Sequence, residues 1–434
     1  MQVDSLLRRP RGASGKPFAL LLLLALGAGP QAGSIEAAKA PPTAGIVSAA
    51  PGSDPGREAA LYPDTVFRPE GGPQVAFFSA GSTEVVSLRV SVPLEESFDE
   101  AGAAQILRVQ ARNRMVSLGE RIGARVDVTR TPHALVYQVY GSVQDLDFLG
   151  WILAEGLSSP QPSLFDEARR SVSRELDRRL ETPEGTLSLR LRAQLVPGTA
   201  PLEGRAGTLE RLDHGHVSAL WARTHLRSRL QIVVAGRVDP LLALATVAEL
   251  GIPDEGPRPQ LPAPEATGDP RGSPEVIRHW LARGYTVAAE HTPRALVAAR
   301  HLSLLVRESP GDYEVFLELW DLGRSRALVV TGAAYDRSRT AMIRRLDGLL
   351  DESEGLLGPE RVRAISAELR TELRMATHSP WGLANLVGQR WEAGEGVEGA
   401  ARLLDALEGV EEADVRRLLA SLREGARAQE ELRP

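Results

Sequence analysis

The sequence predicts an α+β fold made of two similar domains, each with helices packed on a largely antiparallel sheet. Short runs of alternating or β-branched apolar residues, typical of strands, are separated by longer segments with the apolar spacing of helices. The same order of elements recurs, in weaker form, after a proline- and glycine-rich segment at residues 251–273. The chain has 434 residues, of which 43% are hydrophobic, so it is long enough to bury two cores.

The first half, residues 73–250, is predicted to form an N-terminal domain. Residues 85–92 alternate and are rich in valine, which indicates a strand. Residues 101–118 are predicted to form a helix whose apolar side carries Ile106, Leu107 and Val109. The remaining elements are predicted as strands at 123–128, 134–140 and 230–236, and as helices at 143–157 and 164–180.

The second half, residues 274–434, is predicted to form a C-terminal domain of the same kind. Its strands are expected near residues 284–288 and 327–330. Its helices are expected at 294–307, 338–350 and 359–375, and from 397 to the C-terminus. Two domains built from a similar order of elements are therefore predicted, although identity alone reveals no internal repeat.

The N-terminus has the pattern of an export signal. Four basic residues precede an apolar run at residues 18–26, and small residues follow it. The run is short for a bilayer-spanning helix, so we predict a cleaved signal peptide over 1–32 and an exported protein, periplasmic or secreted. An uncleaved anchor or a wrongly assigned start codon are the alternatives.

Two segments lack apolar periodicity and are rich in proline, glycine and alanine. Residues 33–72 are predicted to be a disordered spacer, because such a composition buries too little apolar surface to fold. Folded structure is therefore expected to begin near Pro73. Residues 251–273 are predicted to link the two domains.

The composition excludes several classes of function. The net charge of −6 and the lack of a basic stripe interleaved with aromatic residues argue against a nucleic-acid partner. The chain has no cysteine, which excludes disulfides, thiolate metal sites and cysteine nucleophiles. The eight histidines are scattered, and the sequence has no nucleophile elbow, phosphate-binding loop or dinucleotide fingerprint.

Several segments of the first half match one family in order and approximate spacing. They are residues 86–90 leading into 99–104, then 122–129, 158–160 with Phe165, 174–176, 207–210 and 234–240. Across roughly residues 75–253 the chain resembles the pitrilysin/insulinase family of zinc metallopeptidases, which includes the mitochondrial processing peptidase subunits. The resemblance implies a half-clam architecture of two similar domains. It is thinner beyond Arg271.

The zinc motif of that family is missing at the matching position. An H-x-x-E-H motif places two histidines on one helical face to bind the metal, with a glutamate that activates water. The positions that correspond here are Gln105, Arg108 and Val109. Glutamine is a poor zinc ligand, arginine neither ligates nor accepts a proton, and valine is apolar. The sequence therefore predicts no bound metal, no cofactor and no catalytic residues.

Active relatives take a third zinc ligand from a glutamate on a later helix, and Glu175 corresponds to it. One carboxylate does not hold a tetrahedral zinc ion that needs three protein ligands and a water. Glu175 is followed by arginines three and four residues later, which is ordinary surface chemistry of a helix. We therefore interpret Glu175 as a solvated helix residue.

The second half has a candidate substrate-binding pair, Arg307 and Tyr313. Active relatives use an arginine and a tyrosine in the second domain to hold the substrate backbone and to stabilise the oxyanion, and this segment resembles theirs with one residue fewer between the two. A forked guanidinium and a directed hydroxyl suit developing negative charge. The alternative is a turn at Pro310 and Gly311 beside a half-buried tyrosine, without a function.

The resemblance leads to one expectation about function and one alternative. A member that lacks the zinc motif is expected to be a non-catalytic subunit that pairs with a zinc-bearing peptidase subunit or with itself, and that contributes substrate-binding residues or the wall of a peptide chamber. The alternative is a structural or peptide-binding scaffold of a protein complex. No nucleic acid partner and no integral membrane segment are expected.

Overall fold

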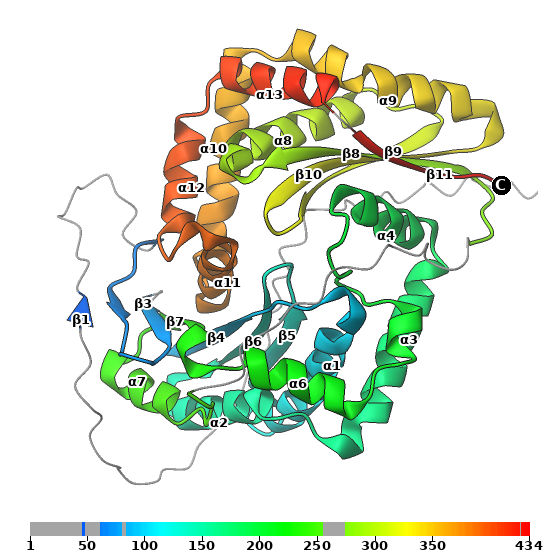
Figure 1. Cartoon of the computed structure of the whole chain (residues 1–434). Helices are drawn as coiled ribbons and strands as arrows, with labels where there is room; N and C mark the ends of the chain where they lie inside the picture. The colour runs from blue at the N-terminus through cyan, green and yellow to red at the C-terminus, as the bar shows by residue number, and fades with distance from the viewer. Residues whose placement is uncertain (1–45, 48–60, 80–83, 255–273, 426) are drawn as a thin grey trace, which may run out of the picture.

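The computed structural model describes residues 46–47, 61–79, 84–254, 274–425 and 427–434 and contains two sheets with helices packed on them (Figure 1). The N-terminal half forms the lower part of the molecule in Figure 1, and the C-terminal half the upper part. The predicted α+β class with helices packed on two sheets is confirmed. The predicted signal peptide at 1–32 lies outside the described residues, as do most of the predicted spacer and the greater part of the predicted linker.

The first sheet has seven strands in the order β1-β2-β3-β7-β4-β6-β5. Their bounds are β1 Ile46–Val47, β2 Thr65–Phe67, β3 Gln74–Phe78, β7 Gln231–Gly236, β4 Val85–Pro93, β6 Ala134–Ser142 and β5 Arg125–Arg130. Strands β3 and β7 pair in parallel, and the other described pairs of this sheet are antiparallel. The prediction of a largely antiparallel sheet is therefore confirmed.

One face of this sheet forms the larger core with the helices of the first half. These helices are α1 Ala103–Gly119, α2 Leu146–Leu157, α3 Phe165–Leu180, α5 Ala206–Leu209, α6 His214–Thr224 and α7 Pro240–Ala248. Side chains alternate along a strand, so Ile232 and Val234 of β7 face this core while Val233 and Ala235 face the opposite side. Strand β7 is therefore buried on both faces, which explains its continuous apolar run.

The second sheet has four antiparallel strands in the order β11-β8-β10-β9. Their bounds are β11 Arg427–Leu432, β8 His279–Ala288, β10 Ser325–Ala334 and β9 Tyr313–Asp321. The helices of this half are α8 Thr292–Glu308, α9 Asp336–Leu356, α10 Pro359–Ala376, α11 Pro380–Arg390, α12 Gly399–Glu408 and α13 Glu412–Glu424. Helices α8, α9, α10, α12 and α13 contribute to the core on one face of the sheet.

Each half covers the other half's sheet with one helix. Helix α4 (Pro183–Leu195) of the first half places Leu187 and Leu191 against Trp280 and Ala282 of β8. Helix α11 of the second half packs on β4 and β7 of the first sheet. Both helices lie between the two halves (Figure 1), so the two sheets are joined through buried apolar surface on either side.

Ordered structure begins before Pro73, the expected start of the fold. Leu61 is 1% exposed and belongs to the apolar cluster under α11. Strand β2, at residues 65–67, pairs with β3. The predicted spacer at 33–72 is therefore wrong for residues 46–47, which pair with β2, and for residues 61–72, where Leu61, Val66 and Phe67 are buried.

The chain also ends differently from the prediction. A helix was expected from residue 397 to the C-terminus. The structure instead has two helices, α12 and α13, followed by β11, which is an edge strand paired with β8. The sequence of β11 is mostly polar, because this strand is short and half-exposed at the sheet edge.

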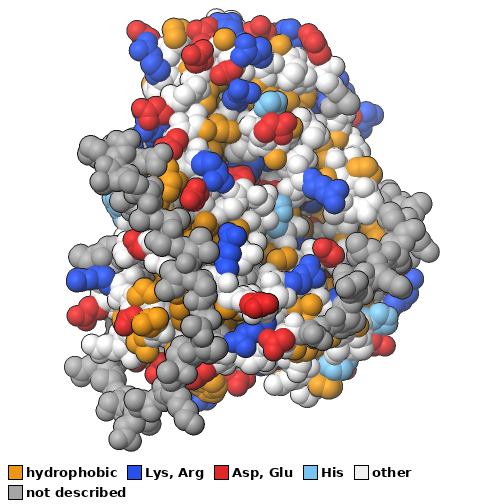
Figure 2. Space-filling view, turned by 60° about the vertical axis from the view of Figure 1, so that its left-hand side comes forward, with side chains coloured by type: hydrophobic (Ala, Val, Ile, Leu, Met, Phe, Trp, Pro, Cys, Tyr) orange, Lys and Arg blue, Asp and Glu red, His pale blue; other side chains and the backbone are white. Residues whose placement is uncertain are grey.

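The described surface carries charges of both signs. Figure 2 shows basic and acidic side chains interspersed with apolar ones over the face that it presents. Within the described residues, no helix combines the length and the apolar character needed to cross a bilayer.

Candidate functional site

Helix α1 is held at its N-terminus by a buried carboxylate. Gly102 precedes the helix with a φ of 112°, a left-handed value that favours glycine. The N–H groups of Gly102 and Ala104 donate to Oε1 of Glu96 at 2.9 and 3.0 Å. These bonds satisfy two of the free donors of the first helical turn, and they fix the orientation of α1 against the sheet.

This orientation places the three positions of the missing metal motif on one half-exposed face. Gln105, Arg108 and Val109 are intermediate in exposure, whereas Ile106 and Leu107 between them are buried in the core. Helix α1 packs against α3, which carries Glu175. The structure therefore brings together the four residues that the resemblance pointed to.

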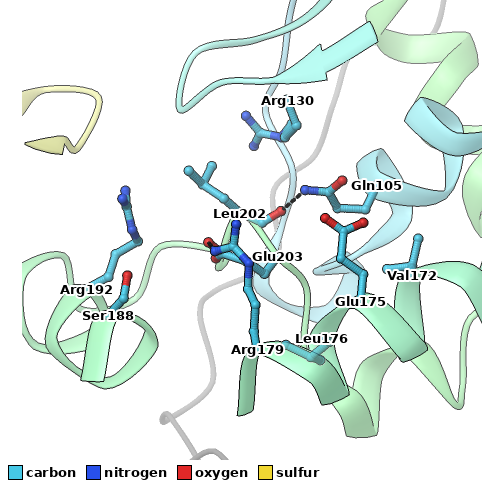
Figure 3. A pocket seen from close by; sticks show the side chains of 10 residues that line it. All are labelled: Gln105, Arg130, Val172, Glu175, Leu176, Arg179, Ser188, Arg192, Leu202 and Glu203. Atoms are coloured by element: carbon cyan, nitrogen blue, oxygen red, sulfur yellow. Dashed lines mark hydrogen bonds and ion pairs between the residues drawn. The ribbon is translucent and has the colours of Figure 1, made fainter. Parts of the chain in front are cut away.

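The polar members of this group bind one another. Nη2 of Arg108 lies 2.7 Å from Oε2 of Glu175, and Nε of Arg108 donates to Oε1 of Gln105 at 2.5 Å. Nε2 of Gln105 in turn donates to the carbonyl oxygen of Leu202 at 2.6 Å (Figure 3). We call this chain of hydrogen bonds the Arg108 network. Glu175 is thus an ion-pair partner, a more specific role than the solvated helix residue that we expected.

The Arg108 network does not fit a zinc ion. A catalytic zinc site needs three neutral or anionic ligands and an open position. Here the glutamate is paired with a guanidinium, the amide is engaged on both sides, and Val109 has no donor atom. Within the described parts of the chain, no group of three His, Cys, Asp or Glu side chains is arranged to hold a metal ion.

Two adjoining cavities lie beside the Arg108 network. The first has a volume of about 270 Å³. It is lined by Gln105 of α1, Arg130 of β5, six residues of α3 and α4 among them Glu175 and Arg192, and Leu202 and Glu203 of the loop that follows α4 (Figure 3). The second has a volume of about 280 Å³ and extends from there toward Leu322 of the second half. Arg130, Leu176, Arg192, Leu202 and Glu203 line both cavities, so the two form one continuous site.

One buried and one half-buried arginine give this site its electrostatic character. The side chain of Arg130 is 5% exposed, and burial lowers its pKa while the Glu96 carboxylate partly restores it. Burial also lowers the pKa of Arg192, whose guanidinium lies 5.1 Å from the centre of the Trp320 ring and donates to the carbonyl oxygen of Asp321 at 3.1 Å. Sequence analysis missed both residues, because neither belongs to a motif and the fold alone brings β5 to α4.

The candidate pair of the second half lies apart from these cavities. Arg307 is exposed in the last turn of α8, and Tyr313 is half-buried at the first position of β9. The alternation of β9 places Tyr313 with Val315, Leu317 and Leu319 against the core of the second half. Neither Arg307 nor Tyr313 lines either cavity.

The fold is that of a peptidase-like scaffold, and two of the positions that the resemblance aligns with zinc-site residues form the Arg108–Glu175 ion pair. No family model and no curated protein matches the sequence. Solved structures do match the fold. An inactive domain of peptidase M16 from Pseudomonas fluorescens superimposes with a TM-score of 0.70 at 13% identity, covering 84% of this chain and 96% of that chain.

Two further structures have the same fold. The periplasmic protease PqqL from Escherichia coli matches with a TM-score of 0.67 at 10% identity, and the match covers 92% of this chain and 47% of that one. This chain therefore spans about half the length of that protease. A chain of complex III2 from Candida albicans matches with a TM-score of 0.67 at 13% identity, covering 83% of this chain and 93% of that chain. The fold is that of the M16 peptidases, which confirms the resemblance at the level of the fold.

Proposed function

We propose that this chain is a catalytically inactive, peptidase-like subunit that pairs with a zinc-bearing peptidase subunit of the same fold and forms part of a chamber for peptides. The observation that carries the proposal is the Arg108 network. A guanidinium bound to Glu175 supplies a positive charge where the resemblance expects a metal, but it leaves no position for an activated water. The fold is retained while the chemistry is not.

The lengths of the compared chains support pairing. A match to nearly all of this chain takes up only 47% of the length of PqqL. A single chain of that length has room for a second region of similar size, to which the partner subunit of the proposed pair would correspond. Export of the chain is part of the proposal, and its support is the basic and apolar pattern of residues 1–32.

Arg307 and Tyr313 remain a proposed contribution to substrate binding. Arg307 is exposed at the end of α8, so a partner or a peptide can reach it, whereas the ring of Tyr313 packs on the core. Substitution of Arg307 is therefore the cleaner test. In the complex, Arg307→Ala is expected to lower peptidase activity and to leave assembly unchanged, and normal activity would remove this role.

A structural or peptide-binding scaffold is the second candidate. The observation in its favour is the similarity to a chain of complex III2, a multisubunit assembly. Co-purification of the chain from its native source, followed by mass spectrometry, separates the two candidates. A zinc-bearing relative among the partners supports the paired peptidase, and an assembly without one supports the scaffold.

The absence of metal chemistry has its own test, in which the site is rebuilt. The triple variant Gln105→His, Arg108→Glu and Val109→His restores the motif on the face of α1 that meets α3, so Glu175 becomes available as a third ligand. We expect about one zinc ion per chain by elemental analysis of this variant and none in the natural protein. The matched control adds Glu175→Gln to the triple variant and should lose the metal. Stoichiometric zinc in the natural chain, together with chelator-sensitive hydrolysis, would overturn the proposal.

A further inference from the structure

The lining of the two adjoining cavities includes positively charged side chains, of which Arg130 is the most buried. Arg130 reaches them from β5, and its buried Nε and Nη1 have no hydrogen-bond partner among the described residues. Its Nη2 lies 3.7 Å from Glu96, and that carboxylate already accepts two N–H groups of the first turn of α1. A buried donor without a partner is costly, so a ligand acceptor at this position would be favourable.

A second arginine faces the same space from α4. The Nε of Arg192 is also buried without a partner among the described residues, while its Nη1 is bound to the carbonyl oxygen of Asp321. Figure 3 shows the side chains of Arg130 and Arg192 on the border of the cavity. Arginine offers several donors in one plane, a geometry that matches a carboxylate.

The charges around the cavities leave these two arginines available. The lining contains four arginines, Arg130, Arg179, Arg192 and Arg205, against two glutamates, Glu175 and Glu203. Glu175 is paired with Arg108, and Glu203 is paired with Arg179 at 2.7 Å. Outside these pairs the lining carries Arg130, Arg192 and Arg205, against the nearby Glu96 carboxylate and the second oxygen of Glu203, which is buried without a hydrogen-bond partner among the described residues. The remaining excess of positive charge is about one unit, and Arg205 lies over the Phe98 ring at 4.2 Å.

The second cavity supplies an apolar wall next to these arginines. Its aliphatic lining comes from α3, from α4, from the loop after α4 and from the second half: Leu176, Leu180, Leu189, Val196, Leu202 and Leu322. Its volume of about 280 Å³ exceeds what a single aliphatic side chain fills. The site thus suits a ligand with a carboxylate at one end and apolar groups directly beside it.

We propose that this site binds the free C-terminus of a peptide whose last side chain is apolar. The terminal carboxylate accepts hydrogen bonds from Arg130 and Arg192, and the last side chain lies against the leucines of α3 and α4. The choice of a peptide as the ligand rests on the proposed function, whereas the carboxylate and the apolar group follow from the lining. The site would then select peptide ends and hold them beside the Arg108 network.

Fluorescence anisotropy of the full chain with labelled octapeptides tests the proposal. The probes end in leucine with a free carboxylate, in leucine with an amidated C-terminus, or in glutamate. We expect the free-acid leucine peptide to bind at least tenfold more tightly than either of the others. Arg130→Gln and Arg192→Gln should each weaken binding of the free acid at least tenfold and leave the amide unchanged. The matched control Arg114→Gln, a half-buried arginine outside the cavities, should change neither.

A second variant keeps the test decisive if an arginine variant fails to fold. Ala193 lines the second cavity, so Ala193→Trp should fill the apolar part and weaken the free-acid leucine peptide while the arginines stay in place. Equal affinity for acid and amide, or no binding of the leucine peptide, would overturn the inference. If octanoate binds as tightly as the leucine peptide, the site recognises a free fatty acid rather than a peptide, and the inference is also overturned. Pairing with a catalytic subunit is measured separately, so failure of one proposal does not imply failure of the other.

Discussion

Two arginine–glutamate pairs of this molecule have the same chemistry and opposite surroundings. Arg108 and Glu175 bridge α1 and α3 with side chains 18% and 47% exposed. Arg89 of β4 and Glu392, just after α11, lie 2.5 Å apart with side chains 2% exposed each. The first pair fills a position at the surface of one half, whereas the second is sealed between the two halves.

Both members of the buried pair have further hydrogen-bond partners, whereas in the surface pair only Arg108 has a further partner among the described residues, Gln105. Nε of Arg89 donates to Asn385 at 3.3 Å, and its Nη1 donates to Ser91, whose hydroxyl donates to Glu392. Thr131 donates to the other oxygen of Glu392 at 3.2 Å. An ion pair is stable in a buried site only when its remaining polar atoms are bound, so this network fixes how α11 lies on the first sheet. The comparison indicates that one pair joins the two halves of the molecule, whereas the other links two helices within the first half.

The largest expected effect is the loss of Arg89. Arg89→Ala leaves the Glu392 carboxylate buried without its counter-charge, and we expect a loss of about 3–5 kcal/mol in the free energy of unfolding. Urea denaturation measures it. The double variant Arg89→Met with Glu392→Met removes both charges and should recover most of the loss. A loss below about 1 kcal/mol in the single variant would contradict the conclusion that this ion pair stabilises the contact between the two halves.

A third pair, His225 and Tyr137, is buried and polar but carries no formal charge, so it can be compared with the buried ion pair. Nε2 of His225 lies 2.7 Å from the hydroxyl of Tyr137, and both residues are buried in the first core. Burial lowers the pKa of His225 from 6.5 to about 3, and nearby Arg114 adds to the effect. At a pH between the folded pKa of about 3 and the unfolded pKa of 6.5, His225 binds a proton in the unfolded chain but not in the folded chain. The contribution of neutral, buried His225 to stability is therefore fully present above the unfolded pKa and decreases as the pH falls below it.

We therefore expect His225 to contribute a loss of about 2 kcal/mol in the free energy of unfolding between pH 7 and pH 5, since one pH unit corresponds to about 1.4 kcal/mol. Urea denaturation across this range measures the loss. The variant His225→Gln keeps a polar group beside Tyr137 and should flatten the slope. The control His216→Gln removes an exposed histidine of α6 and should leave the slope in place. An unchanged slope in His225→Gln would mean that other groups set the pH dependence.

The close approach of α11 to the buried pair predicts an effect of intermediate size. A Cβ atom added at Gly388 would lie 1.9 Å from Nη1 of Arg89, so Gly388→Ala forces the guanidinium or the helix to move. We expect a loss of about 1–3 kcal/mol, the usual range for overpacking. The control Gly348→Ala adds a methyl group to α9, where nothing lies within 4 Å, and should be neutral or stabilising. Equal effects of the two substitutions would show that Arg89 is not confined by α11.

The buried pair also shows where sequence patterns stop being informative. The alternation of residues 85–92 correctly predicted strand β4, in which Val86, Leu88 and Val90 face the core of the first half. The alternation did not indicate what covers the polar side, where Ser87, Arg89 and Ser91 are 0–1% exposed under α11. The segment that covers them follows almost 300 residues later, and local periodicity contains no information about such a partner. The sequence did not predict helices α4, α6, α7 and α11 or strands β2, β3 and β9. Helices α4 and α11 owe their burial to the other half.

The sequence predicted the candidate site about as far as it predicted the fold: it gave the positions of residues but not their partners. The resemblance located Gln105, Arg108, Val109 and Glu175, and the structure places them together. It did not reveal that Arg108 and Glu175 bind each other, because residue types alone do not give the direction of a side chain. Arg130 and Arg192 gave no signal, since their importance depends on burial and unpaired donors that only packing creates.

The smallest expected effect is at the surface pair. Arg108→Ala removes the ion pair with Glu175, whose half-exposed carboxylate is then solvated at little cost. We expect a change of about 0.2–1 kcal/mol in the free energy of unfolding, reduced by salt. Comparison of Arg108→Ala and Arg89→Ala in 50 mM and 500 mM salt separates the two environments, because screening reaches the exposed pair and not the sealed one. A loss in Arg108→Ala as large as that in Arg89→Ala would mean that the Arg108 network is a structural requirement of the first half.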